Sequence, residues 1–526
     1  MLENFPFYLG LVVIILLLVM LAKRLQVAYP VLLVVAGLLI SFVPGLPQLH
    51  IDPELIFIIF LPPLLFDAAW AISWKELWRW RRVISSFAFP VVFLSALAVA
   101  LVANHFIPGF SLALGFVLGG IVSPPDAVSA GAILKFVKVP KRMSSILEGE
   151  SLLNDASSLI IFRFSLIAVA TGQFIWQEAA LSFCWMVLGG VGIGLLVAFL
   201  FMKTHKLFPT EPQMDIVLTI VAPYVMYIAA EEMYSSGVLA VVSGGLLLSN
   251  KRHLFLNSSS RIRSASVWES LTFVMNGLVF MFIGLELPDI TNSLGNISLS
   301  EAIGYGLLIT AVLIIGRMIA TYGAVVITLI ARNFITVADG SPGFRVPLIM
   351  GWAGMRGVVS LAAALSIPVE MDSGTAFPQR SLILFITFIV ILVTLLMQGL
   401  TLPYLIRKIK LPHYTDLLPE EETDRHIRQQ FAALALEHLR NTYGAAWDSD
   451  PVFEYMARKW ERLSGSEQDF EWQQSHGKIH QEIIHQQRRW LLSHNHEHSN
   501  VDEDIVRRHL HYLDIEEEKI KAAAYR

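Results

Sequence analysis

The sequence predicts an all-α, polytopic membrane protein with thirteen transmembrane helices and a helical cytoplasmic tail. Of the 526 residues, 55% are hydrophobic and only 16% are charged, against roughly 25% charged residues in soluble domains. The mean hydropathy is +0.59. The net charge of −4 gives no reason to expect a nucleic-acid partner, and the single cysteine, Cys184, excludes an intrachain disulfide.

Apolar segments recur along residues 1–410, which we interpret as one transmembrane domain. Their lengths suit a hydrocarbon layer about 30 Å thick, with tilt in the longer ones. No Lys or Arg precedes the first segment, so we expect a retained helix rather than a signal peptide. The predicted spans are 7–22, 29–43, 54–70, 83–106, 111–134, 145–170, 178–202, 213–232, 235–249, 266–287, 300–331, 345–369 and 379–406.

The loop charges predict the orientation of these spans. Lys and Arg collect on the odd-numbered loops, for example Lys75, Arg79 and Arg81 on the third, whereas the even-numbered loops hold only Arg380. Positive loops stay on the cytoplasmic side. We therefore expect a multi-pass protein of the plasma (inner) membrane, with its N-terminus outside and its C-terminus in the cytoplasm.

The composition changes at residue 411, and residues 411–526 are polar and charged. Helical periodicity over 423–443, 453–463, 470–493 and 502–525 predicts a helical cytoplasmic tail. A regulatory role for this tail stays open. His494, His496 and His498 alternate within it, and both a metal site and a flexible polar stretch are compatible with that run.

Thirteen spans indicate an internal repeat of six helices, in which spans 1–6 and 8–13 are inverted relative to each other. Span 5 carries Ser123-Pro124-Pro125-Asp126, and its repeat mate, span 12, carries the glycine-rich residues 351–357 with Arg356. Proline obstructs a continuous helix and glycine loosens one. Both spans are therefore expected to be broken within the membrane, each with a charge at the break.

Span 6 contains the most informative residues of the chain, because carboxylates within a membrane cost roughly 2.5–3.5 kcal/mol each on insertion scales. Ser151 and Asp155 are four residues apart and share one helix face, and Glu150 and Asn154 share the adjacent face. Their oxygen atoms, with Asp126 at the span 5 break, suit a small hard cation such as Na⁺. The alternative is that Asp155 and Asp126 merely pair with arginines.

Positive charges within the spans are few. We expect Arg356 to form a structural ion pair with Glu150 that bridges the two repeats, with anion binding by Arg356 as the rival interpretation. Arg163 and Arg317 are interior charges that could pair with Glu148 or Asp67. Asp67 itself either lies near the ion site or caps a bend in span 3, and both interpretations remain open.

Five stretches carry a resemblance to a known family: residues 61–63 (LPP), 149–155 (GESLLND), 236–242 (SGVLAVV), 268–273 (WESLTF) and 354–357 (GMRG). At these residues the chain resembles the sodium/proton exchangers of the NhaP/NHE type, within the monovalent cation:proton antiporter superfamily. The stretches are short but are spread over most of residues 1–410.

The resemblance implies an inverted-repeat fold with crossed broken helices, a homodimer, and exchange by an elevator-like movement. It implies that Asp155 binds the ion and the proton, with Asn154 beside it, that Ser151 and Asp126 help to form the Na⁺ site, and that Glu150 pairs with Arg356. Members with Asn-Asp at this position are electroneutral. At the span 5 break this chain has Pro125-Asp126-Ala127 where the family has Thr or Val before Asp-Pro, which leaves the cation preference open.

We therefore expect a secondary active monovalent cation/proton antiporter that performs electroneutral Na⁺/H⁺ exchange by alternating access. A K⁺/H⁺ antiporter of the same fold and a cation channel are the alternatives. No cofactor is expected beyond the transported Na⁺ and H⁺, and the partners are these ions and the lipid bilayer. No enzyme activity is expected, since His50, His105, His205 and His253 all lie away from the centres of the spans.

Overall fold

The computed structural model divides the chain into two compact units, Met1–Pro412 and His413–Arg526. The structure describes residues 5–25, 28–43, 53–134, 137, 139–172, 176–208, 210–292, 294, 297–334, 343–371, 374–409, 420–443, 458, 460, 482–491, 493, 509–510 and 512–519.

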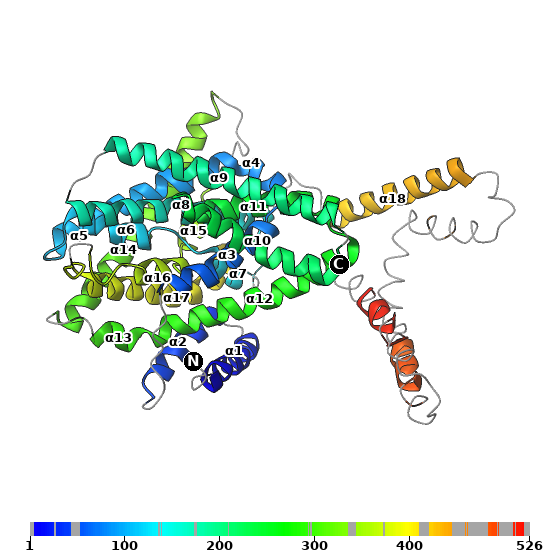
Figure 1. Cartoon of the computed structure of the whole chain (residues 1–526), viewed down its shortest axis with the longest axis horizontal. Coiled ribbons are helices and arrows are strands. Elements are labelled where there is room, and N and C mark those ends of the chain that lie inside the picture. The colour runs from blue at the N-terminus through cyan, green and yellow to red at the C-terminus, as the bar shows by residue number, and fades with distance from the viewer. Residues whose placement is uncertain are drawn as a thin grey trace. The chain divides into compact units, whose positions relative to one another are not determined.

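Throughout these described residues, every regular element is a helix (Figure 1). Each of the thirteen predicted spans overlaps at least one helix of the first unit. The helices are α1 (Phe5–Leu25), α2 (Tyr29–Ser41), α3 (Pro53–Ala71), α4 (Trp74–Ser86), the π-helical turn η2 (Phe87–Val91), α5 (Val92–Phe106), α6 (Leu112–Val122), α7 (Ala127–Leu134), α8 (Lys141–Thr171), α9 (Trp176–Leu207), α10 (Pro212–Glu232), α11 (Gly237–Phe255), α12 (Ser258–Leu285), α13 (Leu287–Asn292), α14 (Leu299–Ala331), α15 (Arg345–Trp352), α16 (Val358–Leu365), α17 (Arg380–Ile409) and α18 (Glu420–Tyr443).

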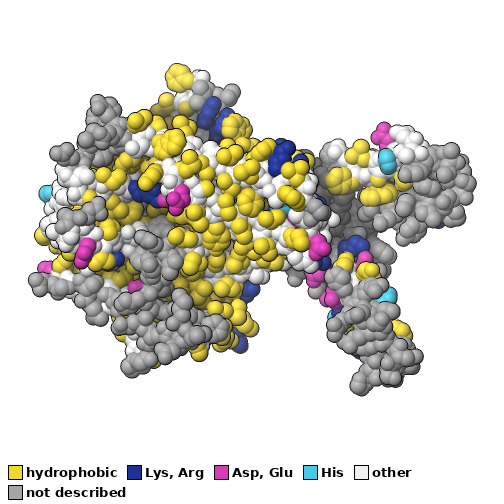
Figure 2. Space-filling view, viewed as in Figure 1, with side chains coloured by type: hydrophobic (Ala, Val, Ile, Leu, Met, Phe, Trp, Pro, Cys, Tyr) yellow, Lys and Arg dark blue, Asp and Glu magenta, His cyan; other side chains and the backbone are white. Residues whose placement is uncertain are grey.

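Many of these helices present apolar side chains to the outside of the first unit. In the described part, seven helical stretches are long and apolar enough to cross a membrane, and three shorter apolar helices accompany them. Leu181 and Leu188 on α9, for example, are 75% and 72% exposed. Figure 2 shows hydrophobic side chains over most of the described surface on this face. Such a surface suits a lipid environment rather than water.

Polar side chains start several of these helices. The side chains of Ser73, Ser111, Ser236, Asn257 and Ser298 each accept a hydrogen bond from a backbone N–H in the first turn of α4, α6, α11, α12 and α14. The first turn of a helix has backbone N–H groups without helical partners, which these caps satisfy. Two of the capped helices, α4 and α12, begin at Trp74 and Ser258, well before the predicted spans at 83 and 266.

The fourth span is longer than its apolar segment predicts. Helix continues without interruption from Trp74 to Phe106, 33 residues, which is about 50 Å at 1.5 Å per residue. The predicted start at residue 83 is wrong because the first turns carry Lys75, Arg79 and Arg81, and hydropathy registers only the apolar part of a helix. Trp74 and Trp78 stack on this polar extension with ring centroids 6.1 Å apart.

Helices α2 and α12 cross at two glycines. A Cβ atom on Gly37 would overlap the carbonyl oxygen of Met281, and one on Gly284 would overlap the carbonyl oxygen of Val34. Only a hydrogen at both positions lets the two backbones touch. This contact attaches the N-terminal helices to the rest of the first unit.

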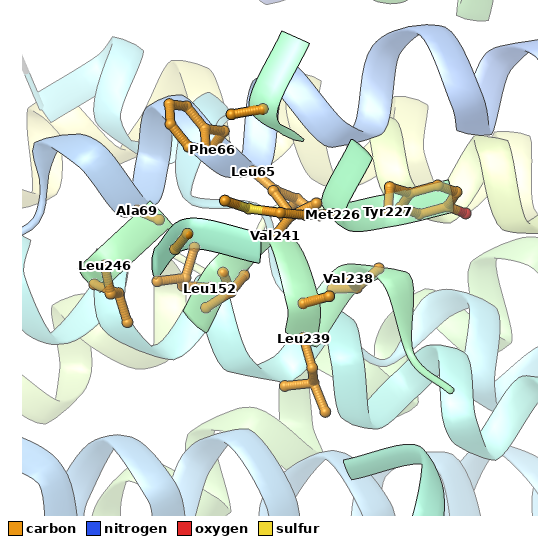
Figure 3. Close-up of a cluster of buried hydrophobic side chains, with 14 of the residues drawn as sticks. Leu65, Phe66, Ala69, Leu152, Met226, Tyr227, Val238, Leu239, Val241 and Leu246 are labelled. Carbon is orange, nitrogen blue, oxygen red and sulfur yellow. The ribbon is translucent and has the colours of Figure 1, made fainter. Parts of the chain in front are cut away.

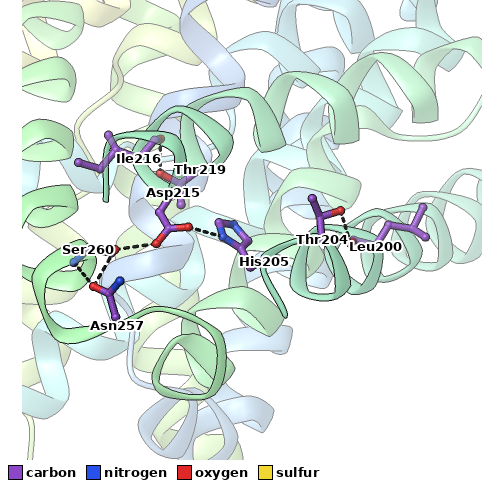
Figure 4. Close-up of polar contacts among 8 residues, drawn as sticks. All are labelled: Leu200, Thr204, His205, Asp215, Ile216, Thr219, Asn257 and Ser260. Atoms are coloured by element: carbon purple, nitrogen blue, oxygen red, sulfur yellow. Dashed lines mark hydrogen bonds and ion pairs between the residues drawn. The ribbon is translucent and has the colours of Figure 1, made fainter. Parts of the chain in front are cut away.

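A polar cluster, with His205, Asp215 and Ser260 buried and Asn257 exposed, joins one end of α9 to the starts of α10 and α12 (Figure 4). His205 Nδ1 lies 2.8 Å from Asp215 Oδ1, and Ser260 Oγ lies 2.6 Å from Asp215 Oδ2. Asn257 caps α12 at the same place. Because every member has a partner, the cluster can be buried without leaving a polar group unsatisfied.

The second unit contains α18 and short helical stretches over 482–491 and 512–519. Arg488 donates to Asp514 and Glu517, each at 2.7 Å, and so connects the last two stretches. The predicted helix at 453–463 is described only at residues 458 and 460, and the run His494, His496 and His498 lies outside the described residues.

Substitution of Gly284 by Ala should destabilise the protein, since an added methyl group would separate α2 from α12 at a cost of about 1–3 kcal/mol. Gly316→Ala is the matched control, because a Cβ on Gly316 meets no atom within 4 Å. The measurement is the temperature at which the detergent-solubilised protein loses its monodisperse peak in size-exclusion chromatography. Equal melting temperatures for the two variants would contradict this packing.

Candidate functional site

Two helix interruptions meet inside the first unit. Helix α6 ends at Val122 and α7 begins at Ala127, while α15 ends at Trp352 and α16 begins at Val358. The backbone N–H of Asp126 donates to the carbonyl oxygen of Met355 at 2.7 Å. Each interruption therefore supplies a hydrogen-bond partner that the other lacks within its own helix.

Gly357 is needed for this contact, because a Cβ atom there would overlap the Asp126 carboxylate. That carboxylate also accepts hydrogen bonds from the backbone N–H and the hydroxyl of Ser129, at 3.3 and 2.5 Å. Asp126 thus caps the start of α7, and its position is set by three neighbours.

Helix α8 lies against the first interruption. Asn154 Nδ2 donates to the carbonyl oxygen of Pro125 at 3.2 Å, and the Ser157 hydroxyl donates to the carbonyl oxygen of Ala88. Asn154 is completely buried, and its Oδ1 has no hydrogen-bond partner within the described part of the chain. Asn154 therefore attaches α8 to the break in the span 5 segment and leaves Asp155, the next residue, on a different face.

Asp155 lies at the wall of a cavity of about 1000 Å³. The residue is only 7% exposed, yet the same cavity reaches the exposed residues Arg252 and His253 at the end of α11. We call it the cation cavity. Its other polar lining residues include Tyr29, Asp67, Asp126, Glu148, Ser151, Arg261, Glu269 and Asn276.

The cavity brings together four of the residues singled out from the sequence: Asp155, Ser151, Asp126 and Asp67. For Asp67 this favours a place near the site over a role in capping a bend. Asn154 does not line the cavity and acts through the backbone of Pro125. Glu150 and Arg356 also lie outside the cavity lining, where both are buried.

The expected pair between Glu150 and Arg356 is wrong. Both carboxylate oxygens of Glu150 accept from Arg317 of α14, at 2.6 and 2.9 Å, with both side chains buried. Arg356 uses its backbone N–H to donate to Thr394 Oγ1 at 3.2 Å, whereas its Nε and Nη1 have no hydrogen-bond partner among the described residues. The interhelical geometry selects Arg317, since a bidentate pair needs both planar groups to face each other.

The expectations for Arg163 and Arg317 as partners of Glu148 or Asp67 are wrong as well. Arg163 pairs with Glu231 of α10 at 2.6 Å. Glu231 also accepts from the backbone N–H of Gly237 at 3.0 Å. Sequence spacing could not indicate these partners because they come from helices far apart in the chain.

Glu148 is a cavity residue that the sequence analysis did not include in the site. The signal was present, because residues 148, 151, 152 and 155 form one stripe at helical spacing, and Ser151, Leu152 and Asp155 line the cavity with it. The signal for Arg317 was weaker. A single charge in an apolar helix predicts a buried partner but does not identify that partner.

The cation cavity can bind a small cation through oxygen atoms. Carboxylate and hydroxyl oxygens replace the hydration shell of hard cations. Within the described residues, no group of three or more His, Cys, Asp and Glu side chains is arranged to hold a metal ion. A monovalent cation requires less negative charge than a divalent one, and hydroxyl, backbone or water oxygens could complete its shell.

Comparison with known proteins identifies the class. Residues 11–408 match the transmembrane family described as sodium/hydrogen exchanger, and the chain belongs to this family. This confirms the resemblance drawn from the five sequence stretches and, with the apolar helices, a multi-pass membrane protein.

The relatives are named as antiporters. The chain is 35% identical over 387 residues to the sodium, potassium, lithium and rubidium/H⁺ antiporter of Bacillus subtilis, a match that covers 72% of this chain and 57% of that protein. It is 33% identical over 420 residues to the antiporter of the same name from Bacillus pumilus, covering 78% and 62%. The chain thus spans about three fifths of the length of these two relatives. It is 34% identical to the Na⁺/H⁺ antiporter ApNhaP of Aphanothece halophytica, covering 73% and 70%.

Among solved structures, the sodium proton antiporter MjNhaP1 from Methanocaldococcus jannaschii at pH 8 has the same fold. Its TM-score is 0.60 at 20% sequence identity, and the match covers 76% of this chain and 97% of MjNhaP1.

Replacement of Arg317 by Met should lower the free energy of unfolding by about 3–5 kcal/mol, because it leaves the buried Glu150 carboxylate unpaired. The double variant with Glu150→Met should recover much of this loss, since both charges are then removed. Thermal unfolding in detergent measures the effect, and the double-mutant coupling of Glu150 should be larger with Arg317 than with Arg356. A larger coupling of Glu150 with Arg356 than with Arg317 would contradict this prediction and support the Glu150–Arg356 pair expected from the sequence.

Proposed function

We propose that the chain is a secondary active monovalent cation/proton antiporter that performs electroneutral Na⁺/H⁺ exchange by alternating access. The observation that carries the proposal is the place of Asp155, a buried carboxylate in an apolar helix whose cavity reaches exposed residues at one end of the bundle. Asp155 has no ion pair with any residue that the structure describes, and a buried carboxylate in that position is costly unless an exchangeable ligand neutralises it.

Asp155 acts as the shared binding group of the two ions. Either a proton or a cation neutralises it, and burial favours the neutral form. In each occupied state the charge of the carboxylate is compensated, so the core carrying α8 can change its exposure. The empty, charged state moves poorly, which couples the two fluxes. One carboxylate then exchanges one Na⁺ for one H⁺.

Asp126 and Ser151 complete the Na⁺ site in this proposal. Both line the same cavity as Asp155. The contact of Asp126 with Met355 and Gly357 makes its position depend on both helix interruptions. Asp67 and Glu148 line the same cavity, where negative charge attracts cations toward Asp155.

The remaining architecture is part of the same proposal. It comprises thirteen spans in inverted six-helix repeats, with α6–α7 and α15–α16 as the crossed broken helices, and a homodimer in the plasma membrane. Basic Lys203, Arg252 and Arg261 near the ends of α9 to α12 support a cytoplasmic location for that side. The N-terminus is then outside, and residues 411–526 form a cytoplasmic tail.

A K⁺/H⁺ antiporter of the same fold is the second candidate. Two relatives are named for sodium, potassium, lithium and rubidium, and the family's usual sequence at the first interruption is replaced here by Pro125-Asp126-Ala127. Proton release from proteoliposomes after addition of each cation separates the two, measured with the full chain and with residues 411–526 removed. A channel would instead give a conductance in planar bilayers.

Substitution Asp155→Asn should abolish cation-dependent proton movement in everted vesicles while the protein level stays normal, since an amide neither takes up a proton near neutral pH nor compensates a cation. Dye-monitored pH recovery after Na⁺ addition is the measurement. Asp215→Asn is the control, because it removes a carboxylate outside the cation cavity. It should retain cation-dependent exchange when the activity is normalised to the amount of folded protein. Full activity in Asp155→Asn would refute the proposed function.

A further inference from the structure

A second cavity lies further along the same helices, beyond Asp155. Its volume is about 380 Å³, and its lining includes Ile58 of α3, Leu159 and Arg163 of α8, Glu231 of α10 and Val238 of α11. The cation cavity is lined by earlier residues of α8, from Glu148 to Asp155, and by the far end of α11. The two cavities therefore approach Asp155 from opposite ends of α8.

Only a thin apolar layer separates them. Asp155 and Leu159 are four residues apart on α8, and Ile58 and Leu61 are three apart on α3, so the lining residues of the two cavities are separated by about 4–6 Å along each helix. Leu61, Leu152 and Val238 belong to one buried hydrophobic cluster of α3, α8, α10 and α11. Figure 3 shows Leu152 and Val238 in this cluster. Such a layer stops ions, and its apolar contacts contain no ion pair that would select one arrangement of the helices over another.

The ion pair of Arg163 and Glu231 lies at the second cavity and joins α8 to α10. Arg163 Nη2 is 2.6 Å from Glu231 Oε2, while Glu231 Oε1 accepts from the backbone N–H of Gly237 at the start of α11. A Cβ atom on Gly237 would crowd Glu231 Oε1. The carboxylate is thus fixed on the α10–α11 side, and Arg163 reaches across from the helix that carries Asp155.

We propose that Arg163 and Glu231 are positioning residues of the transport cycle, forming a latch that holds Asp155 open to the cation cavity and closed to the second cavity. This inference rests on the proposed exchange function. Opening of the second cavity requires α8 to move away from α10, and the ion pair must break in that movement. Loss of the pair therefore shifts the population toward the state in which the second cavity reaches Asp155.

Sidedness of thiol labelling tests the latch. In full-length protein with Cys184→Ser, Leu159→Cys reports on the second cavity and Ala68→Cys reports on the cation cavity, each with a membrane-impermeant maleimide applied from either side. We expect R163Q and E231Q to raise the labelling of the residue 159 reporter from outside by about threefold or more, as for loss of a partly exposed pair, and to lower the labelling of the residue 68 reporter from inside.

Matched variants separate the latch from a general loss of structure. E232Q removes a carboxylate at the neighbouring exposed position and should label as the parent does. R163K retains the ion pair and leaves the bond from Gly237 to Glu231 intact, so it should show the parental sidedness. R163Q or E231Q labelling like E232Q, or R163K labelling like R163Q, overturns the proposal.

The labelling experiment distinguishes a failure of the latch from a failure of the proposed antiporter function. Altered sidedness in a protein that catalyses no cation/proton exchange would support the latch and refute the antiporter. Unaltered sidedness in a protein whose exchange depends on Asp155 would refute the latch alone.

Discussion

The contact between the two helix interruptions is the constraint on which the rest of the site depends. Backbone groups that leave a helix inside an apolar environment must find partners elsewhere, because each unsatisfied group costs several kcal/mol. Here the N–H of Asp126 finds the carbonyl oxygen of Met355, and Pro125, whose carbonyl oxygen is free of a helical role, accepts from Asn154. Those two bonds hold α7, α16 and α8 together and place Asp126 on the cavity wall that also holds Asp155.

Charge balance is the second organising factor. Glu150 and Arg317 neutralise each other in a buried, bidentate pair. The pair has no net charge, so only its dipole acts on the cavity. Arg356 is buried beside them without an ion-pair partner among the described residues. Its positive charge lies within the second interruption, between α15 and α16, and is opposite in sign to Asp126 and Asp155. A buried charge without a contact partner persists only if its surroundings supply an opposing potential.

Much of the helical layout could be predicted from sequence, because apolar segments, prolines and glycines are local signals. The interruptions at 123–126 and 353–357 fall where Pro124, Pro125 and the glycines of the GMRG stretch lie. The polar ends of α4, α11 and α12 could not be predicted from hydropathy. These turns are helical but carry charged residues, so they lie outside the apolar segments. Ion-pair partners were the least predictable: Arg317 and Arg356 look alike in sequence, and only the rotation of α14 about its axis decides between them.

The lining of the cation cavity is acidic on balance. It holds the carboxyl groups of Asp67, Asp126, Glu148, Asp155 and Glu269 against the guanidinium groups of Arg252 and Arg261. An acidic lining draws cations inward over a range set by the Debye length, about 30 Å in 10 mM salt and about 8 Å at physiological ionic strength. Loading of the cavity is therefore assisted most in dilute electrolyte, and inert salt should slow it even when the concentration of the cargo is held constant.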